Sequence, residues 1–129
     1  MQNYYKSSNL DNFFKYIDKY FNVNDKMTIF DIGSCHCLES IEFSKKYYNS
    51  KIYAFEANKT SYEVCLENTK NFSNIKVINK CIHNYDGMCK FYPINPQKTI
   101  TSWFDGNRGA SSIFKSNGAV DHIEKYVQD

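Results

Sequence analysis

Residues 28–40, TIFDIGSCHCLES, constrain the fold of this chain more than any other segment. The segment begins with an apolar, β-prone run that ends at Gly33, continues through a turn of small residues, and enters a helical pattern near Leu38. The run over residues 27–32 is too short and too continuously apolar for a surface helix, and it is typical of a buried parallel strand. A parallel strand that leads through a tight turn into a helix leaves backbone N–H groups at the edge of the sheet, where a nucleotide-like ligand can bind.

The rest of the first eighty residues alternates between helical and strand patterns. Apolar residues between Ser8 and Phe21 repeat with the spacing of one helix face, so residues 1–26 are expected to contain a helix that packs on the sheet. The later patterns predict a helix over residues 38–48, a strand over 51–55, a helix from Asn58 or Thr60 to about 71, and a strand over 75–82. Short connections between these elements imply right-handed crossovers and an α/β fold with a parallel sheet.

Two of these helices have faces that we expect to be buried. The first shows apolar spacing at Leu38, Ile41 and Tyr48, and the second at Tyr62, Cys65, Leu66 and Thr69. Thr60 and Glu63 also have the spacing of a capping box, which predicts a helix start at this point.

The pattern changes after Ile82. A turn at Asp86 and Gly87 followed by a β-like run over residues 88–92 predicts a hairpin or an edge strand. Residues 93–118 are rich in Pro, Asn, Gly, Thr and Ser and show little periodicity, which predicts a long loop that acts as a lid or a binding surface. Residues 120–127 are expected to form a terminal helix.

The composition favours one folded domain over residues 1–129. Hydrophobic residues make up 42% and aromatic residues 17% of the 129 residues, which is enough to form a core. The formal net charge is +2 and the lysines are scattered, so the charge pattern does not indicate nucleic acid as a partner. No apolar run approaches the roughly 20 residues that span a bilayer, and we expect no membrane partner.

The cysteines indicate reduced thiols rather than disulfide bonds. Five is an odd count, and the N-terminus lacks the pattern of a signal peptide, so we expect a cytoplasmic protein. Cys35, His36 and Cys37 are adjacent but have no second pair of ligands at zinc-binding spacing, and we expect no metal.

Two acids at predicted strand ends are the candidate ligand-binding residues. Glu56 follows the second strand, 23 positions after Gly33, where a carboxylate can accept hydrogen bonds from both hydroxyls of a ribose. Asp31 can orient the turn or face a cationic group of a ligand, although each acid alone is also a common helix cap or surface residue. The second glycine of GxGxxG is absent, and an acid-lined site suits a sulfonium and an amino acid better than a pyrophosphate. The residues therefore favour S-adenosyl-L-methionine over NAD.

Several segments together resemble successive motifs of the FkbM-type methyltransferases, which are class I S-adenosylmethionine-dependent enzymes. They are FDIGSCHCLESIEFS, KIYAFEAN, IKVINKCIHNYDGMCKFY and GASSIF, and they span roughly residues 28–114. The resemblance implies a Rossmann-like fold and methyl transfer to an oxygen of a sugar, a glycan or another small molecule. It also implies that the cofactor contacts Asp31, Gly33, Ser34 and Cys35 with its methionine portion, Glu56 with its ribose, Ala57 with its adenine, and Cys81 with its adenine or ribose.

The chain departs from this family at two points. Cys37 stands where the turn usually has a glycine, so the turn must accept a Cβ there. The acid-rich segment of the form KIDVEG, which borders the transferred methyl group in the family, does not follow Phe114. We therefore expect a partial domain of three parallel strands whose first strand is an exposed edge, and this edge favours self-association.

The sequence leaves the catalytic base unidentified. His83 and Asp86 have suitable side chains but lie in a predicted turn, and Trp103 and Arg108 can contact an acceptor or simply pack. Three hypotheses stay open: an S-adenosylmethionine-dependent O-methyltransferase, a catalytically silent cofactor-binding or assembly module, and an NAD- or nucleotide-binding protein.

Overall fold

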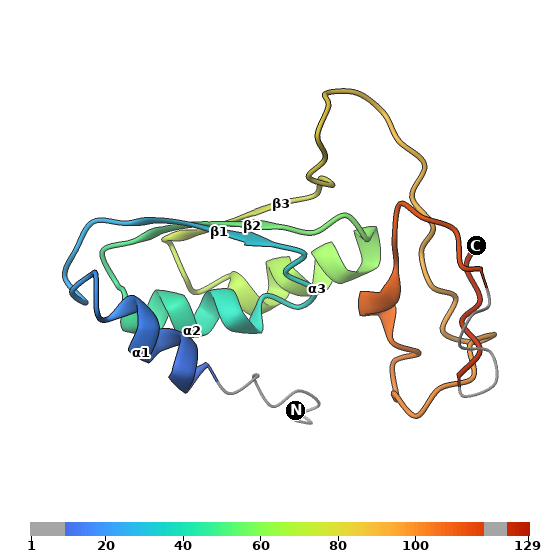
Figure 1. Cartoon of the computed structure of the whole chain (residues 1–129), viewed down its shortest axis with the longest axis horizontal. Helices are drawn as coiled ribbons and strands as arrows, with labels where there is room; N and C mark the ends of the chain where they lie inside the picture. Colours follow the sequence, from blue (N-terminus) through green and yellow to red (C-terminus); the bar gives the residue numbers. More distant parts are fainter. Residues whose placement is uncertain (1–9, 118–123) are drawn as a thin grey trace. The chain divides into compact units, whose positions relative to one another are not determined.

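Strands and helices alternate in the first part of this chain, which we describe from a computed structural model (Figure 1). The structure describes residues 10–117 and 124–129. The chain divides into two compact units, Met1–Lys80 and Cys81–Asp129. The single domain predicted over residues 1–129 stays a prediction. The elements of the first unit are α1 (Asp11–Ile17), β1 (Thr28–Ile32), α2 (Leu38–Lys46), β2 (Lys51–Phe55), α3 (Lys59–Thr69) and β3 (Ile75–Ile78).

The three strands form one parallel sheet in the order β1-β2-β3. Thr28 pairs with Lys51 at one end of the β1–β2 ladder, and Ile32 pairs with Phe55 at the other. Both crossovers proceed in the same direction along the sheet, and α2 and α3 consequently cover the same face (Figure 1). The predicted α/β fold with a parallel sheet is confirmed, and this βαβαβ arrangement is the unit from which Rossmann-like folds are built.

The expectation that the first strand is buried is wrong. β1 is the edge of the sheet and its burial alternates, with Phe30 61% and Ile32 63% exposed. Their side chains point to the face opposite the helices, where Phe30 stacks on Tyr53 with ring centroids 5.6 Å apart. The exposed edge that we expected at this strand is confirmed for the residues that the structure describes.

The buried face of α2 differs from the predicted one. Leu38 and Ile41 are only partly buried and Tyr48 is exposed, whereas the helix buries Ser40, Phe43 and Ser44. The serines let the helix approach the sheet closely, and their hydroxyls are satisfied, since the Ser44 hydroxyl donates to the Asn74 side chain at 2.6 Å. Apolar periodicity missed this face because two of its positions are polar.

The other two helices follow the predictions more closely. α1 packs through Leu10, Phe14 and Ile17 on a cluster formed by Phe43, Tyr47 and Ile52, so it contacts α2 as well as the sheet. Of the face predicted for α3, Cys65 and Thr69 are buried, whereas Leu66 is 45% exposed.

Little regular structure forms in the second unit. The predicted hairpin is wrong, because residues 88–91 form no strand and Tyr92 makes only an isolated bridge to Ser112. Residues 93–117 are largely irregular, as predicted, apart from a 3₁₀ turn (Arg108–Ala110) and isolated bridges.

The predicted terminal helix falls partly outside the described residues. Its positions 120–123 are not described, and residues 124–127 are not helical, because Lys125 forms an antiparallel bridge with Ile100. Within the described ranges, no helix has the length and apolar character needed to cross a membrane.

Candidate functional site

The turn after β1 is tied to the end of β2 by its own backbone. Gly33, with φ +81°, and Ser34 both donate their N–H groups to the Phe55 carbonyl, at 2.9 and 3.0 Å. The Cys35 N–H donates to the Glu56 carboxylate at 2.7 Å. The expectation that these N–H groups point toward a ligand is therefore wrong for residues 33–35: they bind the neighbouring strand end instead.

The carboxylate of Glu56 accepts hydrogen bonds from two different segments at this end of the sheet. Glu56 is 8% exposed, and one carboxylate oxygen accepts the Cys35 N–H while the other accepts the Asn58 N–H at 2.7 Å. Burial raises the pKa of Glu56, the backbone N–H donors oppose that rise, and the nearby Asp31 carboxylate adds to it. The carboxylate thus links the glycine turn to the start of α3.

Asp31 lies at the end of β1 and faces the helices. Its carboxylate accepts a hydrogen bond from the Ser40 hydroxyl at 2.6 Å. Burial raises the pKa of Asp31 despite this hydrogen bond, and the charge of Glu39 raises it further. The two predicted acids therefore lie at the ends of adjacent parallel strands, and the Asp31 carboxylate raises the pKa of Glu56, because both strands end at the same edge of the sheet.

Cys37, which replaces the expected glycine, is accommodated by left-handed backbone. Its φ of 60° and ψ of 23° lie in the region that glycine prefers. Its side chain is 0% exposed and packs with Ala54 and Cys65 in a small core cluster. The thiol of Cys65 donates to the Cys35 carbonyl at 3.1 Å, and both the adjacent Cys37 sulfur and burial raise its pKa. These thiols therefore contribute to packing beneath the turn.

The remaining predicted cofactor residues lie farther along the chain. Ala57 follows Glu56 and is partly buried, and its carbonyl accepts a hydrogen bond from the Asn79 side chain at 3.2 Å. Cys81 does not end the third strand as expected, because β3 ends at Ile78. Cys81 is exposed and is the first residue of the second unit, so its contact with a cofactor stays a prediction.

Sequence reasoning missed three polar residues that hold the site. Ser40 binds Asp31, Asn79 donates to the Glu56 carbonyl at 2.7 Å, and Asn68 donates to the His36 carbonyl at 2.9 Å. The signal for Ser40 was its place one helical turn before Phe43 and Ser44 on α2. The two asparagines had no periodic signal, because a single side-chain amide can serve any nearby carbonyl.

The candidate acceptor and base residues all belong to the second unit. His83 and Asp86 are exposed, as is Trp103, while Arg108 is partly buried in the 3₁₀ turn. Their catalytic roles stay predictions. In the described part of the chain, no group of three His, Cys, Asp or Glu side chains is arranged to hold a metal ion.

Comparison with known proteins finds likenesses among solved structures. Neither the models of protein families nor the curated proteins give a match. Among solved structures, coclaurine N-methyltransferase bound to N-methylheliamine and SAH is similar at 15% sequence identity, with a TM-score of 0.42. The match covers 67% of this chain and 28% of the other, so this chain spans little more than a quarter of the length of that methyltransferase.

Proposed function

We propose that this chain is the cofactor-binding part of an S-adenosyl-L-methionine-dependent methyltransferase. Its acceptor class, following the sequence resemblance, is the hydroxyl of a sugar, a glycan or another small molecule. The cofactor supplies an activated methyl group, and the described residues contribute its binding site. We place the protein in the cytoplasm, a proposal that the free thiols of its five cysteines support.

The observation that carries this proposal is the pair of acids at the carboxyl ends of adjacent parallel strands. Neither Asp31 nor Glu56 takes part in an ion pair among the described residues. A site with two carboxylates and no paired cation repels a pyrophosphate, whereas it attracts the sulfonium and the ammonium groups of S-adenosylmethionine. The charge of the site thus favours this cofactor over a dinucleotide.

The residues fit the ribose of this cofactor as well. Each carboxylate oxygen of Glu56 accepts one N–H from the chain, and an oxygen of this kind can accept a second hydrogen bond. Glu56 therefore has the capacity to bind the two ribose hydroxyls without giving up the backbone contacts that position it.

A catalytically silent module is a second candidate function, and the hydrogen bonds of the turn support it. The N–H groups of Gly33, Ser34 and Cys35 are all used inside the chain, so the turn offers a ligand fewer donors than we expected. A protein that keeps the fold of the site without binding the cofactor tightly is consistent with this arrangement.

Isothermal titration with S-adenosylhomocysteine tests the proposal on the whole chain. We expect measurable binding by the wild-type protein and roughly tenfold weaker binding by Glu56→Gln, because a neutral amide is a poorer acceptor for ribose hydroxyls. Glu63→Gln, the same change at an exposed position of α3, is the matched control and should bind like the wild type. Failure of folded wild-type protein to bind would leave the silent module as the better reading.

A further inference from the structure

We propose that the outer edge of β1 binds a second copy of this chain in antiparallel orientation, so that two three-stranded sheets join into one. This inference rests on the geometry of β1 and its surroundings and is independent of the proposed cofactor.

The backbone of β1 offers one row of unshared hydrogen-bonding groups. In a parallel ladder, alternate residues direct both backbone groups to the same neighbour. Lys51 donates its N–H to the Met27 carbonyl at 2.8 Å, and Gly33 donates to the Phe55 carbonyl at 2.9 Å, so the odd-numbered residues face β2. The N–H and C=O groups of Thr28, Phe30 and Ile32 therefore point away from it, where the described chain provides no strand. Such an edge is a template for another strand.

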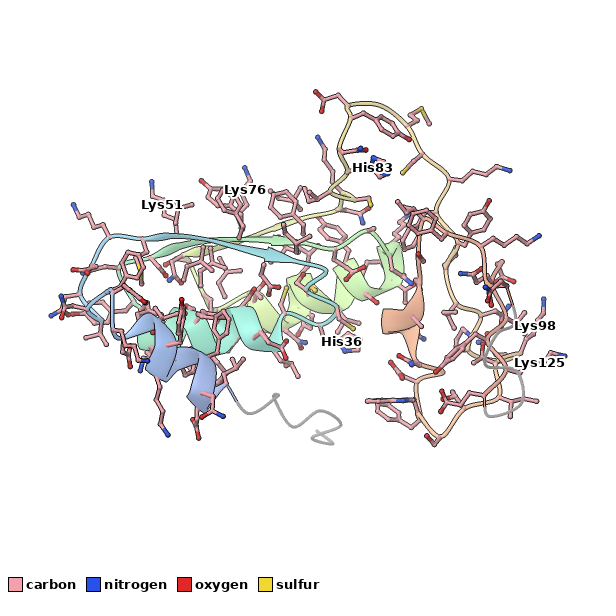
Figure 2. All side chains as sticks on the ribbon, viewed as in Figure 1. His36, Lys51, Lys76, His83, Lys98 and Lys125 are labelled. Carbon is pink, nitrogen blue, oxygen red and sulfur yellow. The ribbon has the colours of Figure 1, made fainter. Side chains whose placement is uncertain are left out.

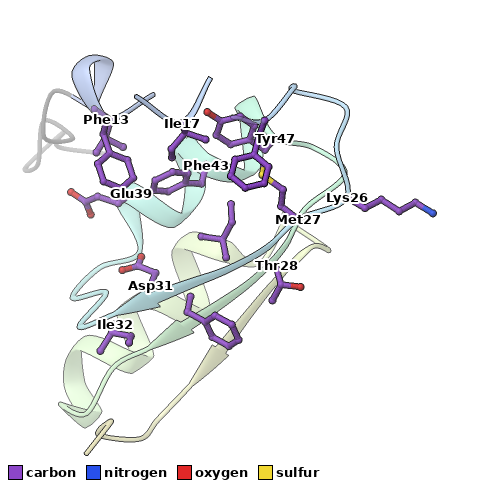
Figure 3. A pocket seen from close by; sticks show the side chains of 14 residues that line it. Phe13, Ile17, Lys26, Met27, Thr28, Asp31, Ile32, Glu39, Phe43 and Tyr47 are labelled. Carbon is purple, nitrogen blue, oxygen red and sulfur yellow. The ribbon is translucent and has the colours of Figure 1, made fainter. Parts of the chain in front are cut away.

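An apolar groove of about 650 Å³ runs along the same edge (Figure 3). Phe13 and Phe21 line it on the helix side of the strand and are 55% and 48% exposed. Phe30 and Ile32 also border it, although their side chains point to the other face of the sheet. Covering an exposed apolar surface of this kind with another protein surface lowers the free energy, because apolar area is removed from water.

The charges along the groove select the orientation of the occupant. Lys26 lies at the end where β1 begins, and Asp31 and Glu39 lie at the opposite end (Figure 3). A two-fold axis across β1 exchanges the ends, so it brings Lys26 of each copy to the acidic end of the other. A parallel arrangement would instead place like charges together. The edge is thus self-complementary, as an isologous interface requires.

If the two-fold axis passes through Phe30, all three residues whose backbone groups point away from β2 pair with the second copy. Thr28 then pairs with Ile32 of the second copy, and the two Phe30 side chains are direct cross-strand neighbours. Because Phe30 already stacks on Tyr53 in its own sheet, this pairing continues an aromatic row across the junction.

A lysine at the far edge of the sheet gives a matched control for these charges. Lys51 and Lys76 project from the face away from the helices (Figure 2). Lys76 lies on β3, at the far edge of the sheet from β1, so its charge should not influence the proposed pairing.

Sedimentation equilibrium over a concentration series tests the proposal on the full chain. We expect reversible dimers for the wild type and roughly tenfold weaker association for Lys26→Glu and for Glu39→Lys, because each variant places like charges at both ends of the interface. Mixing the two variants should restore association, since both contacts between positions 26 and 39 in the mixed dimer again join opposite charges. Lys76→Glu should dimerise like the wild type.

Thr28→Pro provides a second variant that leaves the β1–β2 ladder intact. It removes one outward N–H, and proline is tolerated where a strand's N–H faces solvent, so we expect a folded protein with weakened association. A wild type that stays monomeric at all concentrations would overturn the proposal, and so would charge variants that show no recovery on mixing. S-adenosylhomocysteine binding is measured separately, so a failure of the dimer is distinguishable from a failure of the proposed function.

Discussion

At the scale of single residues, the environment of two carboxylates at this end of the sheet shifts their pKa values. Asp31 and Glu56 are both buried enough that their pKa values rise, even though each accepts hydrogen bonds. The sequence predicted both acids at strand ends because they follow apolar runs. It did not predict their partners, since Ser40, Cys35 and Asn58 reach them only after the helices dock on the sheet.

The raised pKa of Asp31 sets a direction for the pH dependence of stability. A carboxyl whose pKa is higher in the folded state costs stability as pH rises through that pKa, because its charge is then buried. Asp31→Asn removes this cost and keeps an acceptor for the Ser40 hydroxyl. We expect the variant to gain stability relative to the wild type as pH rises above about 3.9, the ordinary pKa of aspartate.

Thermal unfolding between acidic and neutral pH measures this effect. The control is Asp86→Asn, the same change in an exposed loop. A difference between Asp31→Asn and the wild type that stays constant with pH would contradict the expected burial of charge.

Substitutions at Cys37 distinguish the cost of backbone strain from the loss of side-chain packing. A non-glycine residue in the left-handed region costs roughly 1–2 kcal/mol, which glycine avoids at an entropic cost of about 0.4–1 kcal/mol. Cys37→Gly and Cys37→Ala both lose the buried thiol, but only alanine keeps the strain. We expect the glycine variant to be roughly 0.5–1 kcal/mol more stable than the alanine variant in urea unfolding. The reverse order would show that φ relaxes once the thiol is gone.

At the scale of elements, helix starts depend on single side chains. The sequence left two possible caps for α3, and the structure selects Asn58, whose side chain accepts the N–H groups of Thr60 and Ser61 at 3.0 and 3.4 Å. Thr60 is inside the helix and exposed, so the predicted capping box does not form.

We therefore expect Asn58→Ala to destabilise the protein by about 1 kcal/mol, the usual cost of losing an N-cap. Thr60→Ala should cost much less, because its side chain does not cap the helix. Chemical denaturation of both variants, followed by helical circular dichroism, makes the comparison. Equal losses would indicate that Thr60 shares the capping.

The elements that the sequence predicted well are those with an uninterrupted local signal. β2 has the predicted bounds, since five residues of alternating apolar character end at an acid. The predicted hairpin after Ile82 does not form, because a turn signal and a β-prone run do not by themselves bring two strands together.

At the scale of the whole molecule, the second compact unit begins with an exposed stretch of chain. Every residue from 81 to 90 is exposed, and no helix or strand forms there. We expect trypsin to cleave after Lys80 or Lys90 before it cleaves within α2, α3 or the sheet, because proteases require an accessible, extended chain. Mass spectrometry of a time course identifies the cuts, and Lys90→Gln should slow the one after residue 90. Early cleavage after Lys59 or Lys70 would contradict this order.

By itself, the sequence determined the order of strands and helices in the first eighty residues, their parallel arrangement and the acids at two strand ends. Local periodicity, glycine turns and short connections encode these features. Only the tertiary structure decided that Phe30 and Ile32 of β1 are exposed, that serines form the buried face of α2, and that the N–H groups of residues 33–35 bind β2 and Glu56. These depend on which surfaces meet, and contacts between residues distant in sequence leave no periodic signal along the chain.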